Sequence, residues 1–305
     1  MITVSTFAHV DMNKHRSRAR FAILTVIATL VSSVISLQFA APASAAPARN
    51  DSRTEPVYFV HGFELNRSPG HDCNGYWGAA MKKFRALGWT GKLHSVAYYA
   101  GDTNCNIRIA RGNANTAISE YGRLLAWEIY NRYSRYGKSV DIVAHSMGGL
   151  VARAAITGTA RRLSKWPPYI YVEDAVTIGT PHNGTGIANG CSYRECIEMR
   201  RGSTFLNWLA DNAQARGGTD WTMIGTEDDD VVPVASATTQ SGGAGHYVWY
   251  YAGQPLEHSQ QTNNVSGTFR NSYWNYYDSS NWHYQAAGQN IITTAKNACY
   301  YWYRW

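Results

Sequence analysis

The sequence is poor in the features that mark several classes of protein. Charged residues make up only 16% of the 305 residues, whereas 45% are hydrophobic. This balance excludes an intrinsically disordered chain, which needs low hydrophobicity and high net charge. The 27 glycines follow no period of three, which excludes a collagen-like fibre. A chain of this length can bury a full core, and the composition therefore predicts a globular protein of enzyme size.

The chain has one long apolar run, and it lies near the N-terminus. It extends from residue 21 to about residue 40, follows four basic residues between positions 14 and 20, and is followed by Ala43-Ser44-Ala45. Basic residues, an apolar stretch and an A-x-A pattern are typical of a secretory signal peptide. We therefore expect residues 1–45 to be removed, the protein to be secreted and extracellular, and no stable membrane anchor to remain.

A nucleic-acid partner is not expected, although the formal net charge is +7. Removal of the four basic residues of the leader and of Asp11 leaves a charge of about +4. The remaining sequence has no run rich in lysine and arginine, which is what a nucleic-acid-binding protein needs.

The cysteines are few, and their spacing does not fit a zinc site. There are five, and they form no paired C-x-x-C units. Export to an oxidising compartment favours disulfides instead. Cys191 and Cys196 are five residues apart, which suits a small closed loop, and Cys73 and Cys105 lie in two loop-like stretches that we expect to meet. Cys299 is left over, and sequence alone does not fix the connectivity.

From residue 57 onward, short apolar runs alternate with helical patterns, which predicts an α/β fold whose mostly parallel sheet has helices on both faces. Residues 46–56 are expected to be a flexible mature N-terminus, and residues 57–305 a single domain. Helices are expected at 117–133 and 286–301, loops at 242–245 and 263–278, and a small cap between 183 and 216 with a helix-like stretch at 205–209. The six expected strands are residues 57–60, 92–99, 139–144, 172–178, 221–224 and 246–252.

The clearest local motif is Ala144-His-Ser146-Met147-Gly148-Gly at the end of an apolar run. It is typical of a nucleophile elbow, in which a serine sits on a tight turn from strand to helix and needs small neighbours. Ala144 stands where the G-x-S-x-G pattern has its first glycine. A second apolar run ends in His61-Gly62-Phe63, well before the serine.

Together these two segments resemble the secreted bacterial α/β-hydrolase lipases and esterases, over residues 57 to 260. The resemblance implies an α/β-hydrolase fold with a small or absent lid. It also implies an oxyanion hole formed by the backbone N–H groups of Phe63 and Met147. The stretch from Gly179 to Gly184, which contains His182, is similar to a G-T-P-H-x-G segment of these lipases and is expected to be structural.

The catalytic acid is expected just after the next strand, in a run of four carboxylates. In the family the order along the chain is serine, then acid, then histidine. Asp229 matches the acid of the family's D-x-x-V-P loop, and Asp228 and Asp230 stay open as alternatives. Such a run is also typical of a solvated loop or of a calcium site, but it lacks EF-hand spacing.

The catalytic base is expected to follow a last strand, and three histidines qualify. His246 opens that strand, which is the wrong end, because active sites in open α/β sheets form beyond the carboxyl ends of the strands. His258 follows the strand and is the preferred base, whereas His283 lies further on. His145, beside the serine, is interpreted as a packed neighbour that points away.

The sequence thus predicts a serine hydrolase of carboxylic esters with a triad of Ser146, Asp229 and His258, and no metal or organic cofactor. An acylglycerol lipase or carboxylesterase is the first hypothesis, and a feruloyl or other polymer-side-chain esterase is the second. The 11 tryptophans and 21 tyrosines motivate the second, and they would also suit a lipid or polymer surface as a partner. A non-catalytic protein that binds lipid or polysaccharide is the alternative of another class.

Overall fold

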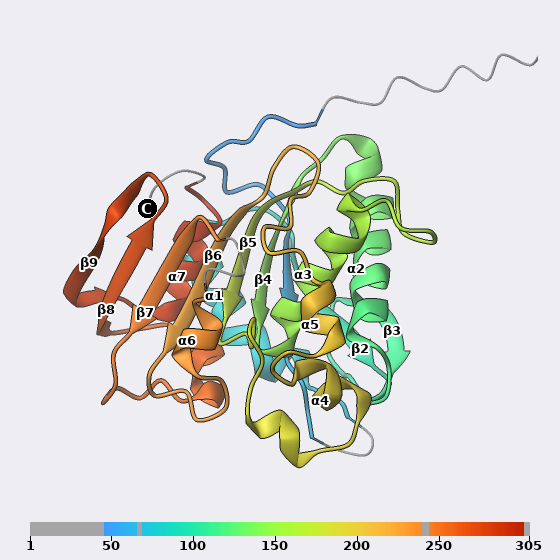
Figure 1. The fold of residues 1–305 in the computed structure, drawn as a ribbon. Helices are drawn as coiled ribbons and strands as arrows, with labels where there is room; N and C mark the ends of the chain where they lie inside the picture. Colours follow the sequence, from blue (N-terminus) through green and yellow to red (C-terminus); the bar gives the residue numbers. More distant parts are fainter. Residues whose placement is uncertain (1–45, 66–68, 240–243, 302–305) are drawn as a thin grey trace, which may run out of the picture. The chain divides into compact units, whose positions relative to one another are not determined.

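A nine-stranded sheet forms the centre of the computed structural model, which describes residues 46–65, 69–239 and 244–301 (Figure 1). The expected signal peptide lies outside these residues. The strand order is β3-β2-β1-β4-β5-β6-β7-β8-β9. Strands β1 to β7 run parallel to one another, whereas β8 pairs antiparallel with β7 and β9 pairs antiparallel with β8. The bounds are β1 Val57–Val60, β2 Leu93–Tyr99, β3 Ile107–Gly112, β4 Val140–His145, β5 Val172–Ile178, β6 Asp220–Thr226, β7 His246–Tyr250, β8 Thr268–Asn275 and β9 Asp278–Gln289.

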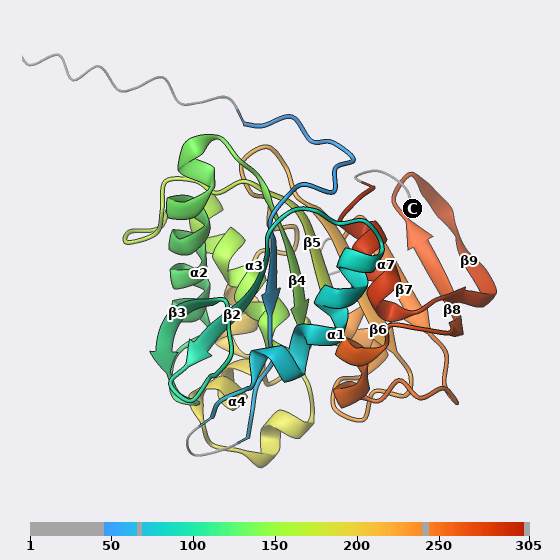
Figure 2. The same ribbon diagram turned by 180° about the vertical axis from the view of Figure 1, so that it is seen from behind.

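Four helices cover the two faces of this sheet (Figures 1 and 2). On one face α2 (Ile118–Arg132) and α3 (Met147–Ala160) pack on the central strands, and on the other α1 (Cys73–Ala86) and α7 (Ile291–Ala298) do so. Because both faces are covered, β1, β4 and β5 are buried along their whole length. The predicted fold class, a mostly parallel sheet between helices, is confirmed.

All six expected strands are present, with ends that differ by one or two residues in four of them. The sequence analysis missed β3, an edge strand whose residues Arg108 and Arg111 are exposed. It was wrong about residues 263–278, because β8 occupies most of that expected loop. The predicted C-terminal helix 286–301 is shorter than expected, since its first residues belong to β9 and α7 begins at Ile291.

The strands β8 and β9 were missed because their sequences are rich in Asn, Ser and Gly. Buried Asn271 pairs with Tyr250 of β7, and Ser272 pairs with Trp249. The neighbouring aromatic strand supplies the packing surface that these polar residues lack. Pairing with a strand that is already formed, rather than intrinsic β-propensity, therefore decides the conformation here.

The region between β5 and β6 has little regular structure and contains short helices. These are η2 (Ile187–Gly190), α4 (Arg194–Met199) and α5 (Thr204–Trp208), the last of which matches the expected helix-like stretch. The structure contains the disulfides Cys73–Cys105 and Cys191–Cys196, and Cys299 is a buried free thiol. The second disulfide ties the start of α4 to the end of η2. Further short helices among the described residues are η1 Ser134–Tyr136, α6 Val234–Ala237 and η4 His258–Asn263.

Residues 46–56 form no helix or strand, but several contacts hold them against the sheet. The Arg49 guanidinium is 3.3 Å from the Asp174 carboxylate, and the backbone N–H of Asn50 donates to Glu173. The backbone carbonyl of Arg53 accepts hydrogen bonds from Thr90 and Gly91. Within the described ranges, no helix is long and apolar enough to cross a membrane.

Candidate active site

Ser146 lies on a strained turn between β4 and α3. Its φ of 56° is in the left-handed region, which few residues other than glycine adopt. The turn is tight because α3 starts against β1: a Cβ atom at Gly148 would lie 2.4 Å from the carbonyl oxygens of Val60 and His61. At position 144 a small side chain suffices, and alanine replaces the glycine of the motif. The local backbone is thus that of a nucleophile elbow.

The imidazole of His258 lies between Ser146 and Asp229. Its Nε2 is 2.9 Å from Oγ of Ser146, and its Nδ1 is 2.8 Å from Oδ2 of Asp229. His258 opens η4, in the segment after β7, and Asp229 lies in the loop after β6. The three side chains meet because β4, β6 and β7 end at the same edge of a parallel sheet. The Asp229 side chain is only 1% exposed, so water does not compete for its hydrogen bond with His258.

The sequence left the acid open among three aspartates, and the structure separates them by their partners. Asp229 accepts hydrogen bonds from the backbone N–H groups of Val231 and Val232 and from the Gln261 side chain. Asp228 instead accepts from the backbone N–H groups of Gly253 and Gln254. Asp230 accepts only from the backbone N–H of His258, at 3.3 Å. Asp228 and Asp230 therefore join the acid loop to the histidine segment, and only Asp229 contacts the imidazole.

The two other candidate bases and His182 lie away from Oγ of Ser146. His246 is buried at the start of β7 beside Asp220, at 2.9 Å, and His283 pairs with Asp278 on β9. His182 is buried with its Nε2 2.8 Å from Oγ1 of Thr177, and burial lowers its pKa well below the usual value. None of the three contacts the serine.

His145 packs its ring against that of His258, with the ring centroids 4.5 Å apart. Burial, and then the charge of His258, lowers the pKa of His145 well below its usual value. His145 is therefore neutral at physiological pH. A neutral neighbour matters here, because a second cation would oppose protonation of His258.

Two tyrosines that the sequence analysis did not identify hold the turn of residues 61–63, which follows β1. The hydroxyl of Tyr76, on α1, accepts the N–H of Gly62 at 3.0 Å and forms a second hydrogen bond with Nδ1 of His145 at 2.5 Å. The hydroxyl of Tyr98, on β2, donates to the carbonyl oxygens of His61 and Gly62 at 2.8 and 2.7 Å. Tyr76 thus links the turn that carries Phe63 to the residue preceding Ser146. Isolated tyrosines in a sequence rich in aromatics gave no indication of this role.

The histidine of the His-Gly motif has a buried partner. Nε2 of His61 is 3.0 Å from Oδ2 of Asp102, and both side chains are fully buried. Burial alone raises the pKa of Asp102, but hydrogen bonds from His61 and the backbone outweigh it and bring the pKa below its usual value. The same carboxylate accepts from the backbone N–H groups of His71, Tyr98 and Tyr99. His61 therefore anchors the turn and does not contact the serine.

A cavity of about 360 Å³ opens beside the serine. Phe63, Ser146 and His258 line it together, and Met147 begins α3 directly after the serine. The remaining wall is mostly apolar and comes from the segment after β1, the 181–199 region and the loop after β6. Its residues are Leu65, Pro181, Thr185, Ile187, Ala188, Gly190, Cys191, Cys196, Met199, Val231 and Val232. Within the part of the chain that the structure describes, no group of His, Cys, Asp and Glu side chains is arranged to hold a metal ion.

A mostly parallel sheet, a serine on a strained turn after β4 and an imidazole from beyond β7 define an α/β-hydrolase. The chain has this fold, and its predicted resemblance to α/β-hydrolase lipases and esterases is confirmed. Within the class, residues 51–201 match the family model described as "PGAP1-like alpha/beta domain". No curated protein matches the chain.

The chain is also similar to several solved structures of hydrolases. The propeptide form of Bacillus licheniformis lipase BlEst2 is 18% identical with a TM-score of 0.39, and the match covers 61% of this chain and 39% of that one. Aspergillus fumigatus lipase B is 14% identical with a TM-score of 0.47, and the match covers 71% of this chain and 52% of that one. The phospholipase PlaB from Legionella pneumophila is 16% identical with a TM-score of 0.43, and the match covers 60% of this chain and 45% of that one. The chain thus matches about half or less of the length of these three proteins.

Proposed function

We propose that the protein is a secreted serine hydrolase of carboxylic esters, an acylglycerol lipase or carboxylesterase. The observation that carries this proposal is the hydrogen-bonded series from Ser146 Oγ through His258 to Asp229, at 2.9 and 2.8 Å. The resemblance of the chain to lipase- and esterase-like α/β-hydrolases supports this proposal. Removal of residues 1–45 as a signal peptide is part of the same proposal.

In the first step His258 acts as general base. Its Nε2 takes the proton of the Ser146 hydroxyl while Oγ attacks the ester carbonyl carbon. Nδ1–H stays hydrogen-bonded to Asp229, which holds the tautomer and stabilises the imidazolium cation. The hydrogen bonds that Asp229 accepts from the backbone keep its carboxylate in place.

The negative charge that develops on the carbonyl oxygen needs fixed donors. The backbone N–H groups of Phe63 and Met147 would supply them, since both residues flank the serine. The protonated His258 then gives its proton to the alcohol oxygen, and the C–O bond breaks. Water, deprotonated by His258, attacks the acyl-enzyme and releases the acid and free Ser146.

The test is hydrolysis of p-nitrophenyl esters from acetate to palmitate by the mature protein and four variants. Ser146→Ala and His258→Ala should each lose about 10⁴-fold or more in kcat. Asp229→Asn should lose a similar factor because the amide favours the wrong imidazole tautomer. Asp228→Asn is the matched control and should lose far less, since Asp228 only joins two loops.

A fluorophosphonate probe separates loss of chemistry from loss of fold. The wild type should be labelled once, at Ser146, and Ser146→Ala should not be labelled. A wild type that cleaves no ester and takes up no probe would contradict the proposal and favour a binding protein. Labelling without cleavage of any p-nitrophenyl ester would support a serine hydrolase. It would favour esters of polymer side chains as the substrate.

A further inference from the structure

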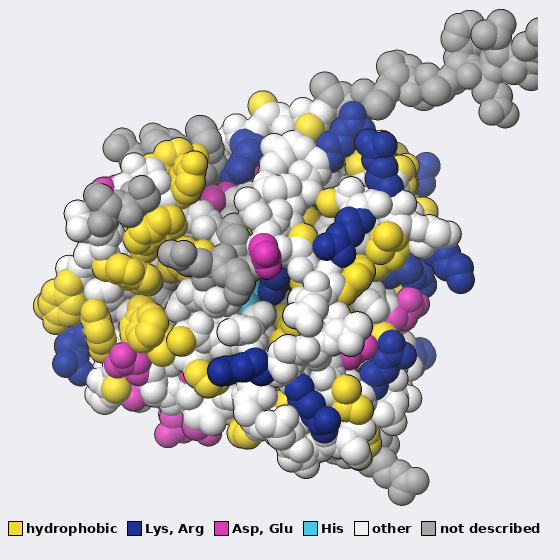
Figure 3. Space-filling model, in the orientation of Figure 1, with side chains coloured by type: hydrophobic (Ala, Val, Ile, Leu, Met, Phe, Trp, Pro, Cys, Tyr) yellow, Lys and Arg dark blue, Asp and Glu magenta, His cyan; other side chains and the backbone are white. Residues whose placement is uncertain are grey.

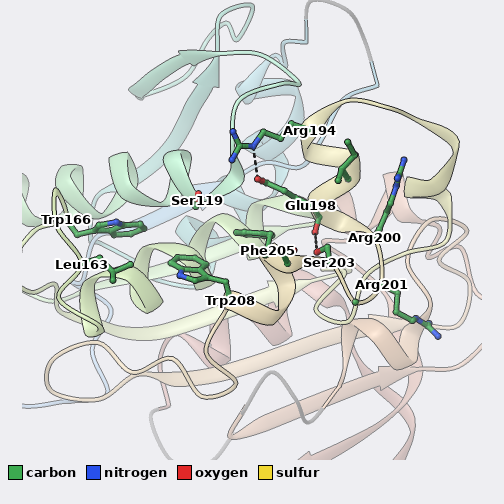
Figure 4. A pocket seen from close by; sticks show the side chains of 13 residues that line it. Ser119, Leu163, Trp166, Arg194, Glu198, Arg200, Arg201, Ser203, Phe205 and Trp208 are labelled. Atoms are coloured by element: carbon green, nitrogen blue, oxygen red, sulfur yellow. Dashed lines mark hydrogen bonds and ion pairs between the residues drawn. The ribbon is translucent and has the colours of Figure 1, made fainter.

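The molecule has a second hollow outside the catalytic cavity, with a volume of about 790 Å³ (Figure 4). The start of α2, the loop after α3, and the helices α4 and α5 surround it. Its lining residues come from segments far apart in the sequence: Ser119, Leu163, Trp166, Arg194, Ile197, Glu198, Arg200, Arg201, Gly202, Ser203, Thr204, Phe205 and Trp208. We call it the α4–α5 groove. It shares no lining residue with the catalytic cavity.

The α4–α5 groove is divided into an apolar half and a basic half. Figure 4 shows Leu163, Trp166 and Trp208 together on one side, and Arg200 and Arg201 on the other. The apolar half is accessible to a ligand, since Leu163 is 36% exposed. An exposed apolar surface with a charged rim typically marks a binding site.

Carboxylates do not neutralise the basic half. Glu198 pairs with Arg194 at 2.9 Å and also accepts the backbone N–H of Ile118. Arg200 donates only to backbone carbonyl oxygens, those of Ala188 and Cys191. Over the described ranges, Arg201 forms no ion pair. Two guanidinium charges therefore remain uncompensated.

The wider surface has the same sign of charge. On the face shown in Figure 3, Lys and Arg side chains gather over the half that carries α2 to α5, whereas hydrophobic side chains gather over β7 to β9. Arg161 lies beside the groove, with its guanidinium 5.7 Å from the ring centre of Trp208. An anion near the groove is thus attracted from several directions.

We propose that the α4–α5 groove binds a single-chain anionic amphiphile, with the alkyl chain on the Trp166 and Trp208 half and the acidic group at Arg201. Guanidinium groups bind carboxylates and phosphates through paired hydrogen bonds, and the excess positive charge selects an anion. The groove is an open hollow of about 790 Å³, which has room for one alkyl chain. The site is distinct from the catalytic cavity and does not depend on the proposed reaction.

The test measures binding of dodecanoate and dodecyl phosphate, below their micelle concentrations, to the full Ser146→Ala chain by calorimetry. Absence of the serine nucleophile prevents turnover, so the result does not depend on whether the protein is an esterase. Saturable binding is expected, and Arg201→Glu in the same background should weaken it at least tenfold. The two ligands distinguish a carboxylate from a phosphate as the preferred acidic group, and preference for either supports the site.

Arg111→Glu is the matched control, because Arg111 is an exposed arginine on β3 that does not line the groove. It changes the net charge by the same amount and should leave affinity within twofold. Leu163→Ser, an exposed change in the apolar half, should weaken binding of the twelve-carbon ligands more than that of octanoate.

Three results would overturn the proposal. The first is an equal loss of affinity in Arg201→Glu and Arg111→Glu, which would show that net charge alone accounts for the binding. The second is equally tight binding of neutral dodecyl maltoside, which would remove the role of the arginines. The third is binding to vesicles of anionic phospholipid without binding to monomeric dodecanoate or dodecyl phosphate, which would identify the face as a membrane contact.

Discussion

At the residue scale, single hydroxyl groups hold the turn of residues 61–63, which carries Phe63 to the wall of the cavity. Tyr76 is the side chain that contacts both the Gly62 backbone and His145, and so it sets the distance between the turn and the elbow. An oxyanion donor is effective only when it lies within a few tenths of an ångström of its position in the transition state. We therefore expect the Tyr76 hydroxyl to affect the proposed reaction through the placement of Phe63.

We expect Tyr76→Phe to lower kcat for p-nitrophenyl butyrate about tenfold, with KM nearly unchanged. The reason is that the loosened turn weakens a contact made mainly in the transition state, and tenfold corresponds to about 1.4 kcal/mol. Steady-state kinetics with the mature protein measure both constants.

Tyr250→Phe is the control for this prediction. Tyr250 is fully buried, and its hydroxyl contacts the Gln289 carbonyl and the Thr294 hydroxyl of α7 rather than the turn at Gly62. Each variant should lose about 1 kcal/mol of stability per hydrogen bond. Equal kcat values for the two variants would show that Tyr76 acts on stability alone.

At the scale of elements, the short segments between β5 and β6 form the walls of both hollows. Cys196 and Met199 of α4 line the catalytic cavity, whereas Ile197 and Glu198 of the same helix line the α4–α5 groove. The Cys191–Cys196 disulfide joins α4 to η2, so the two segments cannot separate freely. A helix of six residues is too short to be stable alone, and these tertiary links hold it.

The dimensions of the catalytic cavity predict a preference among acyl chains. Its volume of about 360 Å³ lies near the small end of the roughly 300–1,000 Å³ typical of ligand cavities. Ala188 in η2 is buried and lines the wall. Ala188→Leu should therefore lower kcat/KM for octanoate esters about tenfold relative to acetate esters, because the added carbons fill the space for the chain.

The acetate ester is the internal control for Ala188→Leu, since its acyl group needs no deep cavity. Overpacking is expected to cost about 1–3 kcal/mol of stability, which thermal unfolding measures separately. An equal loss of kcat/KM for both esters would contradict the assignment of this wall to the acyl chain.

At the scale of the whole molecule, buried carboxyl groups make the stability depend on pH. Glu195 of α4 is buried, and its Oε2 accepts the Tyr99 hydroxyl at 2.7 Å. Burial is the main cause that raises the pKa of Glu195 to about 8. The folded protein therefore holds a proton on this residue at neutral pH, and the carboxyl group adds no negative charge beside Arg194 of α4.

A carboxyl whose folded pKa is raised stabilises the fold fully below its unfolded pKa and loses that contribution as pH rises toward the folded pKa. Wild-type stability should thus fall from about pH 4.5 to about pH 8. Glu195→Gln should remove the Glu195 contribution to this slope, which is on the order of 4 kcal/mol over the interval. Burial also raises the pKa of Asp141 and Asp174, and their contributions should stay. Urea unfolding at a series of pH values measures it.

Asp211→Asn is the control for Glu195→Gln, because Asp211 is an exposed carboxylate in the same region. It should leave the slope of the wild type in place. An unchanged slope in Glu195→Gln would show that Glu195 is already ionised in the folded protein at neutral pH.

The sequence by itself determined the alternation of strands and helices and the turn at Ser146. Those features depend on local periodicity and on small residues around one position, which neighbours along the chain suffice to specify. The order of Ser146, Asp229 and His258 followed from the resemblance to a family. The strands β8 and β9 could not be predicted, because β7 supplies the surface on which their polar residues pair.

Only the tertiary structure decided which aspartate reaches the imidazole. Asp228, Asp229 and Asp230 are chemically identical, and their roles differ because the loop after β6 directs one toward His258 and the other two toward backbone N–H groups. The Tyr76 contact and the α4–α5 groove likewise combine segments that are far apart in the chain. A sequence specifies which side chains are present, but the distances between elements arise only when the sheet and its helices pack.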